Sequence, residues 1–160
     1  MKVHFKLDMR NIAKVNFVHL AEMGKIMKIL LDTHIALWAI ADTEKLSDEV
    51  VRMLESKENE VYYSMASVWE IAIKHKIKPA LMPMPEEEFV ELCEKTGFQY
   101  LPISTEHIFQ VKALIRPKDA PKHNDPFDRM LLAQAKCEKL ILITHDTLIP
   151  YYKEGCVMSV

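Results

Sequence analysis

The chain has 160 residues, of which 49% are hydrophobic and 28% are charged. This length and composition predict one globular domain with a sizeable apolar core, and they exclude a disordered chain or a fibrous repeat. The formal net charge of -2 provides no general attraction to a phosphate backbone, so a nucleic acid would have to be held by local basic patches or by a metal.

Cysteine spacing and hydropathy indicate a cytoplasmic protein. The three cysteines, Cys93, Cys137 and Cys156, lie far apart and form no C-x-x-C motif, so we expect neither a disulfide framework nor a zinc knuckle. No stretch approaches the roughly 18 apolar residues of a membrane span, and the first residues lack the apolar segment of a signal peptide. We therefore expect a cytoplasmic location and no contact with a membrane.

Strands that alternate with helices are predicted from apolar periodicity, capping residues and the positions of proline and glycine. The first strand is an apolar run, interrupted only by Lys28, that ends directly before Asp32, which is typical of a strand buried on both faces of a parallel sheet. In chain order the predicted elements are a strand at residues 27–31, helices at 34–41 and 47–57, a strand at 61–64, helices at 66–76 and 85–96, a strand at 99–103, a helix at 105–115, a loop at 116–124, a helix at 125–138, and strands at 140–144 and 157–160. This order predicts an α/β fold, a doubly wound sandwich with a central parallel sheet flanked by helices.

Residues 1–26 do not fit this alternation. Met27 stands directly before the first predicted strand, as a second possible start would. We expect residues 1–26 to be an N-terminal extension outside the core and residues 27–160 to form the domain.

Four acidic side chains fall at the ends of predicted elements: Asp32, Glu70, Asp128 and Asp146. Asp32 carries the clearest signal, because an acid that follows four apolar strand residues should be partly buried and should need a partner charge or a metal. Carboxylate oxygens suit Mg²⁺ or Mn²⁺, and such a metal can activate water for phosphodiester hydrolysis. We expect Asp32 and Asp128 to be the principal ligands and catalytic residues, with Glu70 and Asp146 completing the pocket.

Each of these acids also has a purely structural interpretation. Ser67 and Glu70 fit a capping box, in which Glu70 reaches back to the backbone amide of Ser67. Asp146 could be an ordinary turn residue after a strand. Asp125 is interpreted as the N-cap of the helix that follows it, with proline at the first helical position, and the chemistry is assigned to Asp128.

Further residues around the acids are candidates for supporting roles. Thr33 and Thr144 are expected to orient bound waters. Basic residues of the proline-containing loop and the adjoining helix are candidates for contact with RNA phosphates, although most such clusters are only solvated surface: Arg116, Lys118, Lys122, His123 and Arg129. Trp38 and Trp69 lie on apolar helices and are expected to belong to the core rather than to stack on bases.

Four sequence blocks together carry a family resemblance. They are LLDTH at residues 30–34, SMASVWEI at 64–71, HNDPFDR at 123–129 and ITHD at 143–146. From residue 27 to about the C-terminus the chain resembles PIN-domain proteins of the VapC toxin type. The resemblance implies a PIN-like parallel-sheet sandwich, a Mg²⁺-dependent endoribonuclease, a homodimer, and a cognate antitoxin whose tail blocks the acidic pocket. It places the four family acids on Asp32, Glu70, Asp128 and Asp146.

Other functions compete with this interpretation. A PIN-domain nuclease of RNA processing would need no antitoxin, and a catalytically silent PIN module would only bind RNA or a protein. An enzyme that uses Asp32 as a covalent phosphate acceptor is less well supported, because haloacid-dehalogenase-type enzymes want a second aspartate where His34 stands. The residues do not indicate which RNA would be cleaved.

Overall fold

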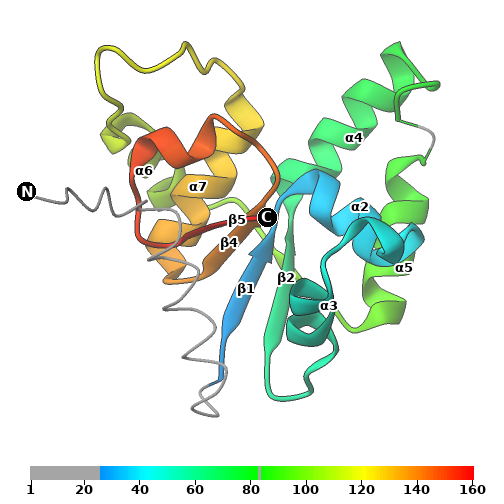
Figure 1. The fold of residues 1–160 in the computed structure, drawn as a ribbon. Coiled ribbons are helices and arrows are strands. Elements are labelled where there is room, and N and C mark those ends of the chain that lie inside the picture. Colours follow the sequence, from blue (N-terminus) through cyan, green and yellow to red (C-terminus); the bar gives the residue numbers. More distant parts are fainter. Residues whose placement is uncertain (1–25, 83) are drawn as a thin grey trace, which may run out of the picture.

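The computed structural model describes residues 26–82 and 84–160, so the expected extension at residues 1–26 lies almost wholly outside the described residues. Five strands form one sheet in the order β3-β2-β1-β4-β5, and every neighbouring pair runs parallel (Figure 1). The strands are β1 (Lys28–Leu31), β2 (Glu60–Ser64), β3 (Gln99–Leu101), β4 (Ile141–Thr144) and β5 (Val157–Ser159). The predicted α/β sandwich with a central parallel sheet is confirmed.

The helices follow the predicted order with small shifts of their ends. They are α2 (Thr33–Ala41), α3 (Asp48–Glu55), α4 (Met65–Ile77), α5 (Glu86–Thr96), α6 (Thr105–Ala113) and α7 (Pro126–Glu138), with short 3-10 helices η1 (Thr43–Lys45) and η2 (Ile149–Tyr152). The 3-10 helices were not predicted. Strand β3 stops at Leu101 rather than at residue 103, because Pro102 has no amide to donate to a neighbouring strand. No helix within residues 26–82 and 84–160 has the length and apolar character needed to cross a membrane.

Strand β1 divides the core into two layers, since successive side chains of a strand point to opposite faces of the sheet. Ile29 and Leu31 pack in one apolar cluster with residues of α2, α3 and α5. Leu30 lies in a second cluster with residues of α7 and η2. Figure 1 shows the same division, with α2, α3 and α5 on one side of the sheet and α6 and α7 on the other.

The strand order places the ends of β1 and β4 where a ligand site is expected. From the central strand β1 the chain adds β2 and then β3 on one side, and later adds β4 and β5 on the other. The sheet order therefore reverses between β1 and β4, and the carboxyl ends of these neighbouring strands open a crevice between their crossover helices. Asp32 follows β1 and Asp146 follows β4 at this point.

A buried polar network connects α7 to the sheet. The Gln134 side chain is fully buried, and its Nε2 donates to the carbonyl of Pro102 at 3.1 Å. Its Oε1 accepts from the Ser64 hydroxyl, whose oxygen accepts from the amide of Ala66 at 2.9 Å and so caps α4. The end of β2, the start of α4 and helix α7 are thus held in one arrangement.

We predict that Gln134→Leu lowers the free energy of unfolding by about 2 kcal/mol, because it leaves two buried polar groups without a partner at nearly constant side-chain volume. Urea unfolding measures the loss. Lys136→Ala is the control on the same helix, since this exposed lysine makes only a surface ion pair with Glu154, and it should change stability by less than about 1 kcal/mol. Equal losses in the two variants would contradict a role for the network.

Candidate metal centre

Asp32 is buried at the end of β1, as its position after an apolar strand predicted. Only 3% of the residue is exposed. Its Oδ1 accepts from the amide of His34 at 3.3 Å and caps α2, and its Oδ2 accepts from the hydroxyl of Thr144 at 2.5 Å. Burial raises the pKa of Asp32, although the hydrogen bond from Thr144 opposes the shift. The carboxylate is held in place by both strands that flank the crevice.

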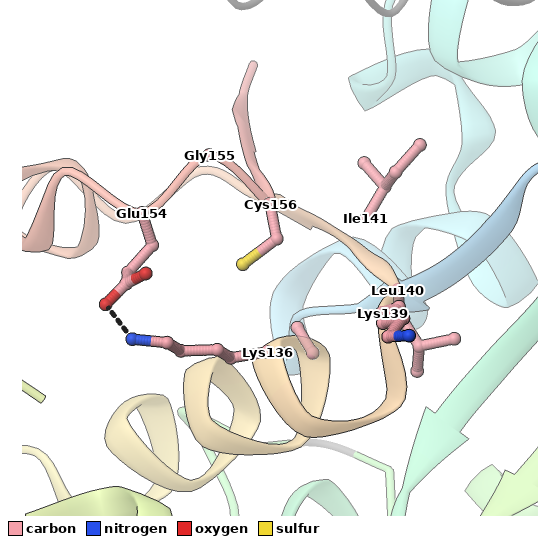
Figure 2. A pocket seen from close by; sticks show the side chains of 8 residues that line it. Lys136, Lys139, Leu140, Ile141, Glu154, Gly155 and Cys156 are labelled. Carbon is pink, nitrogen blue, oxygen red and sulfur yellow. Dashed lines mark hydrogen bonds and ion pairs between the residues drawn. The ribbon is translucent and has the colours of Figure 1, made fainter. Parts of the chain in front are cut away.

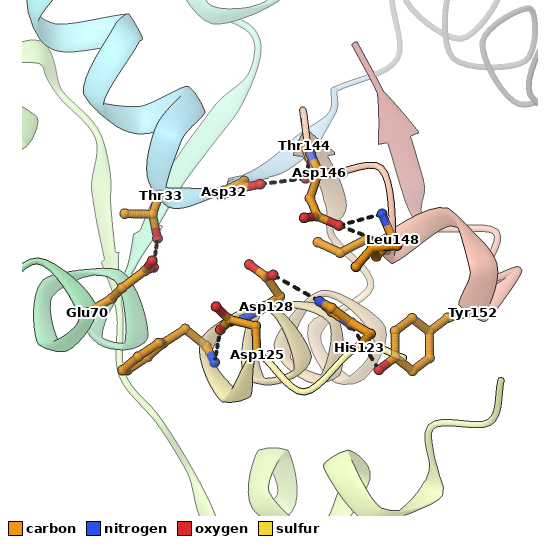
Figure 3. A network of polar contacts seen from close by, with 12 residues as sticks. Asp32, Thr33, Glu70, His123, Asp125, Asp128, Thr144, Asp146, Leu148 and Tyr152 are labelled. Carbon is orange, nitrogen blue, oxygen red and sulfur yellow. Dashed lines mark hydrogen bonds and ion pairs between the residues drawn. The ribbon is translucent and has the colours of Figure 1, made fainter. Parts of the chain in front are cut away.

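Glu70 points from α4 toward the same crevice and is also 3% exposed. The Thr33 hydroxyl donates to its Oε2 at 2.6 Å, and Lys74 forms an ion pair with its Oε1 (Figure 3). Helix α4 begins at Met65 with Ser64 as its N-cap, so Ser67 already lies inside the helix. The alternative of a capping box between Ser67 and Glu70 is therefore wrong.

Asp128 lies in the first turn of α7, and Figure 3 shows its carboxylate among those of Asp32, Glu70 and Asp146. Its pKa is raised to about 8, first by burial and then by repulsion from the surrounding carboxylates, which are Asp125, Asp32, Asp146 and Glu70. The predicted N-cap role of Asp125 is confirmed, because its Oδ1 accepts from the amides of Phe127 at 2.8 Å and Asp128 at 3.3 Å. Asp128 therefore lies among several carboxylates, of which Glu70 is paired with Lys74.

His123 is part of the pocket rather than of a basic surface. The residue is buried, its Nε2 lies 3.0 Å from Oδ2 of Asp128, and its Nδ1 lies 3.2 Å from the Tyr152 hydroxyl. Burial lowers the pKa of His123, which favours the neutral ring. A neutral ring that donates from Nε2 to Oδ2 of Asp128 accepts the Tyr152 hydroxyl at Nδ1. Direct contact of His123 with RNA stays a prediction.

Asp146 combines the two interpretations that its sequence position left open. Its Oδ1 accepts from the amides of Leu148 at 2.6 Å and Ile149 at 2.8 Å, which is the turn-forming role. Its own amide donates to Thr144 Oγ1 at 3.0 Å. One ligand atom each from His123, Asp128 and Asp146 lie within 4.8 Å of one another, so the same carboxylate also faces the candidate cation site.

The structure brings the four predicted acids around one space between α4, α7 and the loop after β4 (Figure 3). His123 is the member that the sequence interpretation did not assign to the metal site. The available signal was its place five residues before Asp128, in the same block. Thr33 and Thr144 hold carboxylates directly, by the hydrogen bonds to Glu70 and Asp32. Their predicted role in orienting waters stays a prediction.

The predicted RNA-contact residues of the loop differ in how their charges are used. Arg116 is engaged within the protein: its Nη1 donates to the carbonyl of Pro121, and its guanidinium lies 5.0 Å from the ring centre of Tyr152. Lys118 and Lys122 are exposed, and Arg129 is half-buried. Contact with phosphate stays a prediction for these last three residues.

A hollow between the end of α7 and the segment before β5 is a different place (Figure 2). It is lined by Lys136, Lys139, Glu154 and Cys156 among others, and Lys136 pairs with Glu154 at 2.7 Å. None of the predicted acids lines it. The candidate chemistry therefore lies at the crevice beside β1.

The donor set of the crevice fits a hard divalent cation. Buried carboxylates that repel one another gain most from a bound positive charge, and oxygen ligands with at most one imidazole suit Mg²⁺ or Mn²⁺ better than zinc. His123, Asp128 and Asp146 are the residues whose ligand atoms lie close enough together to hold it, and the charges of Asp32 and Glu70 lie beside them.

The fold and the pocket together define an all-parallel α/β domain with a candidate site for a divalent cation. The family model of the PIN domain matches residues 29–154. Because this match spans most of the chain, the protein belongs to the PIN domain family, and this membership implies nuclease activity. No curated protein matches the sequence.

We predict that the metal-free protein becomes less stable as the pH rises from about 4 to about 8. The folded state holds a proton on Asp128 up to a pKa of about 8, whereas the unfolded chain releases it near the ordinary value of 3.8, so folding binds protons in this window. Asp128→Asn should flatten the decline and unfold at a higher urea concentration than wild type at pH 8 in EDTA. Asp119→Asn, in the exposed part of the loop, is the control and should keep the wild-type slope. Identical pH slopes in wild type and Asp128→Asn would refute the prediction.

Proposed function

We propose that this protein is a metal-dependent endoribonuclease that uses Mg²⁺ or Mn²⁺ to hydrolyse RNA phosphodiester bonds. The observation that carries the proposal is the set of carboxylates gathered beside the ends of β1 and β4, where burial and then mutual repulsion raise the pKa of Asp128 to about 8. Such an arrangement is costly for a fold without a cation, and a cation there lies where α/β sheets bind ligands.

The side chains of the pocket would prepare it for hydrolysis. Thr144 fixes Asp32, and His123, itself fixed by Tyr152, fixes the orientation of Asp128. Such outer partners commonly determine how well a ligand side chain presents its oxygen. When bound, a divalent cation supplies a Lewis acid that lowers the pKa of water and neutralises charge on the phosphate.

Glu70 differs from the other acids because both of its carboxylate oxygens have side-chain partners. Its Oε2 accepts the hydroxyl of Thr33, and its Oε1 is paired with Lys74. The half-exposed Lys74 offsets part of the negative charge at the edge of the pocket, where an anionic phosphate would have to enter.

The biological role that we propose is that of a toxin in a type II toxin–antitoxin pair, acting as a cytoplasmic homodimer neutralised by a cognate antitoxin. This proposal rests on the four sequence blocks that resemble VapC-type proteins. A neighbouring short reading frame whose product silences the nuclease would distinguish a toxin from an RNA-processing nuclease, which is the alternative.

We predict that the protein cleaves end-labelled single-stranded RNA with Mg²⁺ or Mn²⁺ and not in EDTA. Asp32→Asn and Asp128→Asn should each lower the cleavage rate by about 100-fold or more, because each removes a ligand charge. Asp119→Asn should cleave like wild type. Full activity in EDTA would refute the metal mechanism. RNA binding without cleavage by the wild type would favour a catalytically silent PIN module.

We predict a metal-induced rise in melting temperature that depends on the charge of Asp146. At ten times its Kd, free Mg²⁺ should add about 1.4 kcal/mol, or roughly 3 to 6 °C for a domain of this size. Asp146→Asn keeps an Oδ1 that can accept from the amides of Leu148 and Ile149 but loses the charge, so it should melt higher than wild type in EDTA and respond less to Mg²⁺. Asp146→Ala loses these hydrogen bonds as well and should melt lower than Asp146→Asn. Equal Mg²⁺ shifts in wild type and Asp146→Asn would place Asp146 outside the site.

A further inference from the structure

Trp69 is exposed beside the pocket, which corrects the prediction that it belongs to the core. More than half of the residue, 57%, is exposed, although tryptophan is among the residues that gain most from burial. It lies on α4 directly before Glu70, whose side chain is buried in the pocket. Trp38, the other tryptophan, is partly buried against the core as predicted.

A second aromatic residue supports Trp69 from across the pocket. Phe127 directly precedes Asp128 in α7, and its ring lies 5.3 Å from the ring of Trp69 in an edge-to-face arrangement. The amide of Phe127 is held by the Asp125 cap. Each ring is thus attached to the backbone one residue away from a candidate catalytic acid, and the pair stands at a fixed place on the edge of the site.

The surroundings of the pair suit a nucleic acid strand. Lys74 lies one helical turn beyond Glu70 with its side chain 43% exposed, and the half-buried Arg129 follows Asp128. Exposed aromatic rings and cationic side chains on the elements that carry the site are the groups by which proteins hold unpaired bases and contact the backbone.

We propose that Trp69, supported by Phe127, is a stacking platform for one unpaired base of the RNA, next to the phosphate at the metal centre. The proposal rests on the nuclease function proposed above and deepens it, because it assigns the substrate class. A base in a duplex is already stacked and cannot reach an external ring, so the substrate is single-stranded or looped RNA. Trp69 is then a positioning residue for the substrate rather than a catalytic one.

A competing occupant follows from the rest of α4. Met65, Ile73 and Ile77 lie at four-residue intervals from Trp69 and are also exposed. A second copy of the chain could cover such a stripe. The stripe alone does not favour RNA; the acids, the cations and Phe127 beside Trp69 do. The experiment has to separate the two occupants.

The first measurement is RNA affinity, by fluorescence anisotropy of a labelled single-stranded octanucleotide, in an Asp128→Asn background that prevents turnover. Trp69→Ala should weaken binding by about tenfold or more, whereas Trp69→Phe should retain most of the affinity. Phe109→Ala is the matched control, since this residue of α6 is 66% exposed and far from the acids in sequence, and it should bind like the parent.

The second measurement locates the stacked base. Single nucleotides of the RNA are replaced in turn by abasic ones. At one position, next to the cleaved bond, this replacement should weaken binding to the parent protein. The same replacement should not weaken binding to Trp69→Ala, because the ring that stacks on the missing base is already gone. With Trp38→Phe, Trp69 is the sole tryptophan, and its fluorescence should be quenched by the single-stranded RNA and not by a duplex.

Three outcomes would overturn the stacking platform. Unchanged RNA affinity in Trp69→Ala would do so, and so would equal abasic losses in parent and variant. Trp69 fluorescence that changes with protein concentration and not with RNA would assign the stripe to a second copy of the chain. Cleavage by the wild type, assayed in parallel, distinguishes failure of the platform from failure of the nuclease proposal. If the wild type cleaves RNA and substitution of Trp69 does not change RNA affinity, only the platform is refuted. If the wild type neither binds nor cleaves RNA, the nuclease proposal is refuted as well.

Discussion

Repulsion among buried carboxylates is the constraint on which this structure depends. Asp32 and Glu70 are almost fully buried. Burial of Asp128 itself, followed by repulsion from Asp125, Asp32, Asp146 and Glu70, raises the pKa of Asp128 to about 8. A fold keeps such a cluster only if several backbone elements hold the carboxylates in place. The parallel sheet does so, because the ends of β1 and β4 are adjacent and each delivers one acid.

The acids are also part of the scaffold that holds them. Asp32 caps α2, Asp125 caps α7, and Asp146 accepts from two amides at the start of η2. In each case one carboxylate oxygen satisfies backbone donors, which are the groups that helix starts leave unpaired. The same carboxylates therefore line the site and fix the starts of the helices around it. Asparagine can replace these aspartates as a cap but not as a charge, which is why the Asp-to-Asn variants separate the two roles.

Much of the fold could be predicted because local signals and the global arrangement agree. The apolar run before Asp32 predicted both a central strand and a buried acid, and Pro126 after Asp125 predicted the start of α7. The start of α4 was harder, because Ser64 and Ser67 both suit an N-cap. Only the end of β2 and the bond from Ser64 to Gln134 decide it, and these contacts are distant in sequence. The place of His123 beside the acids was hard to predict for the same reason, because one of its partners is Tyr152, a residue 29 positions away.

Trp69 shows why a helix beside a charged pocket is difficult to interpret from periodicity. An amphipathic helix usually turns its apolar residues inward. Helix α4 buries Ser67 and Glu70 beside its apolar Ala66 and Ile71, because the partners of Glu70 and Ser67, above all Thr33, lie inside the domain. Trp69, about 200° round the helix from Ser67, then faces outward. The need to place Glu70 at the pocket thus leaves a large aromatic ring at its edge, where solvent exposure is unfavourable unless a ligand covers it.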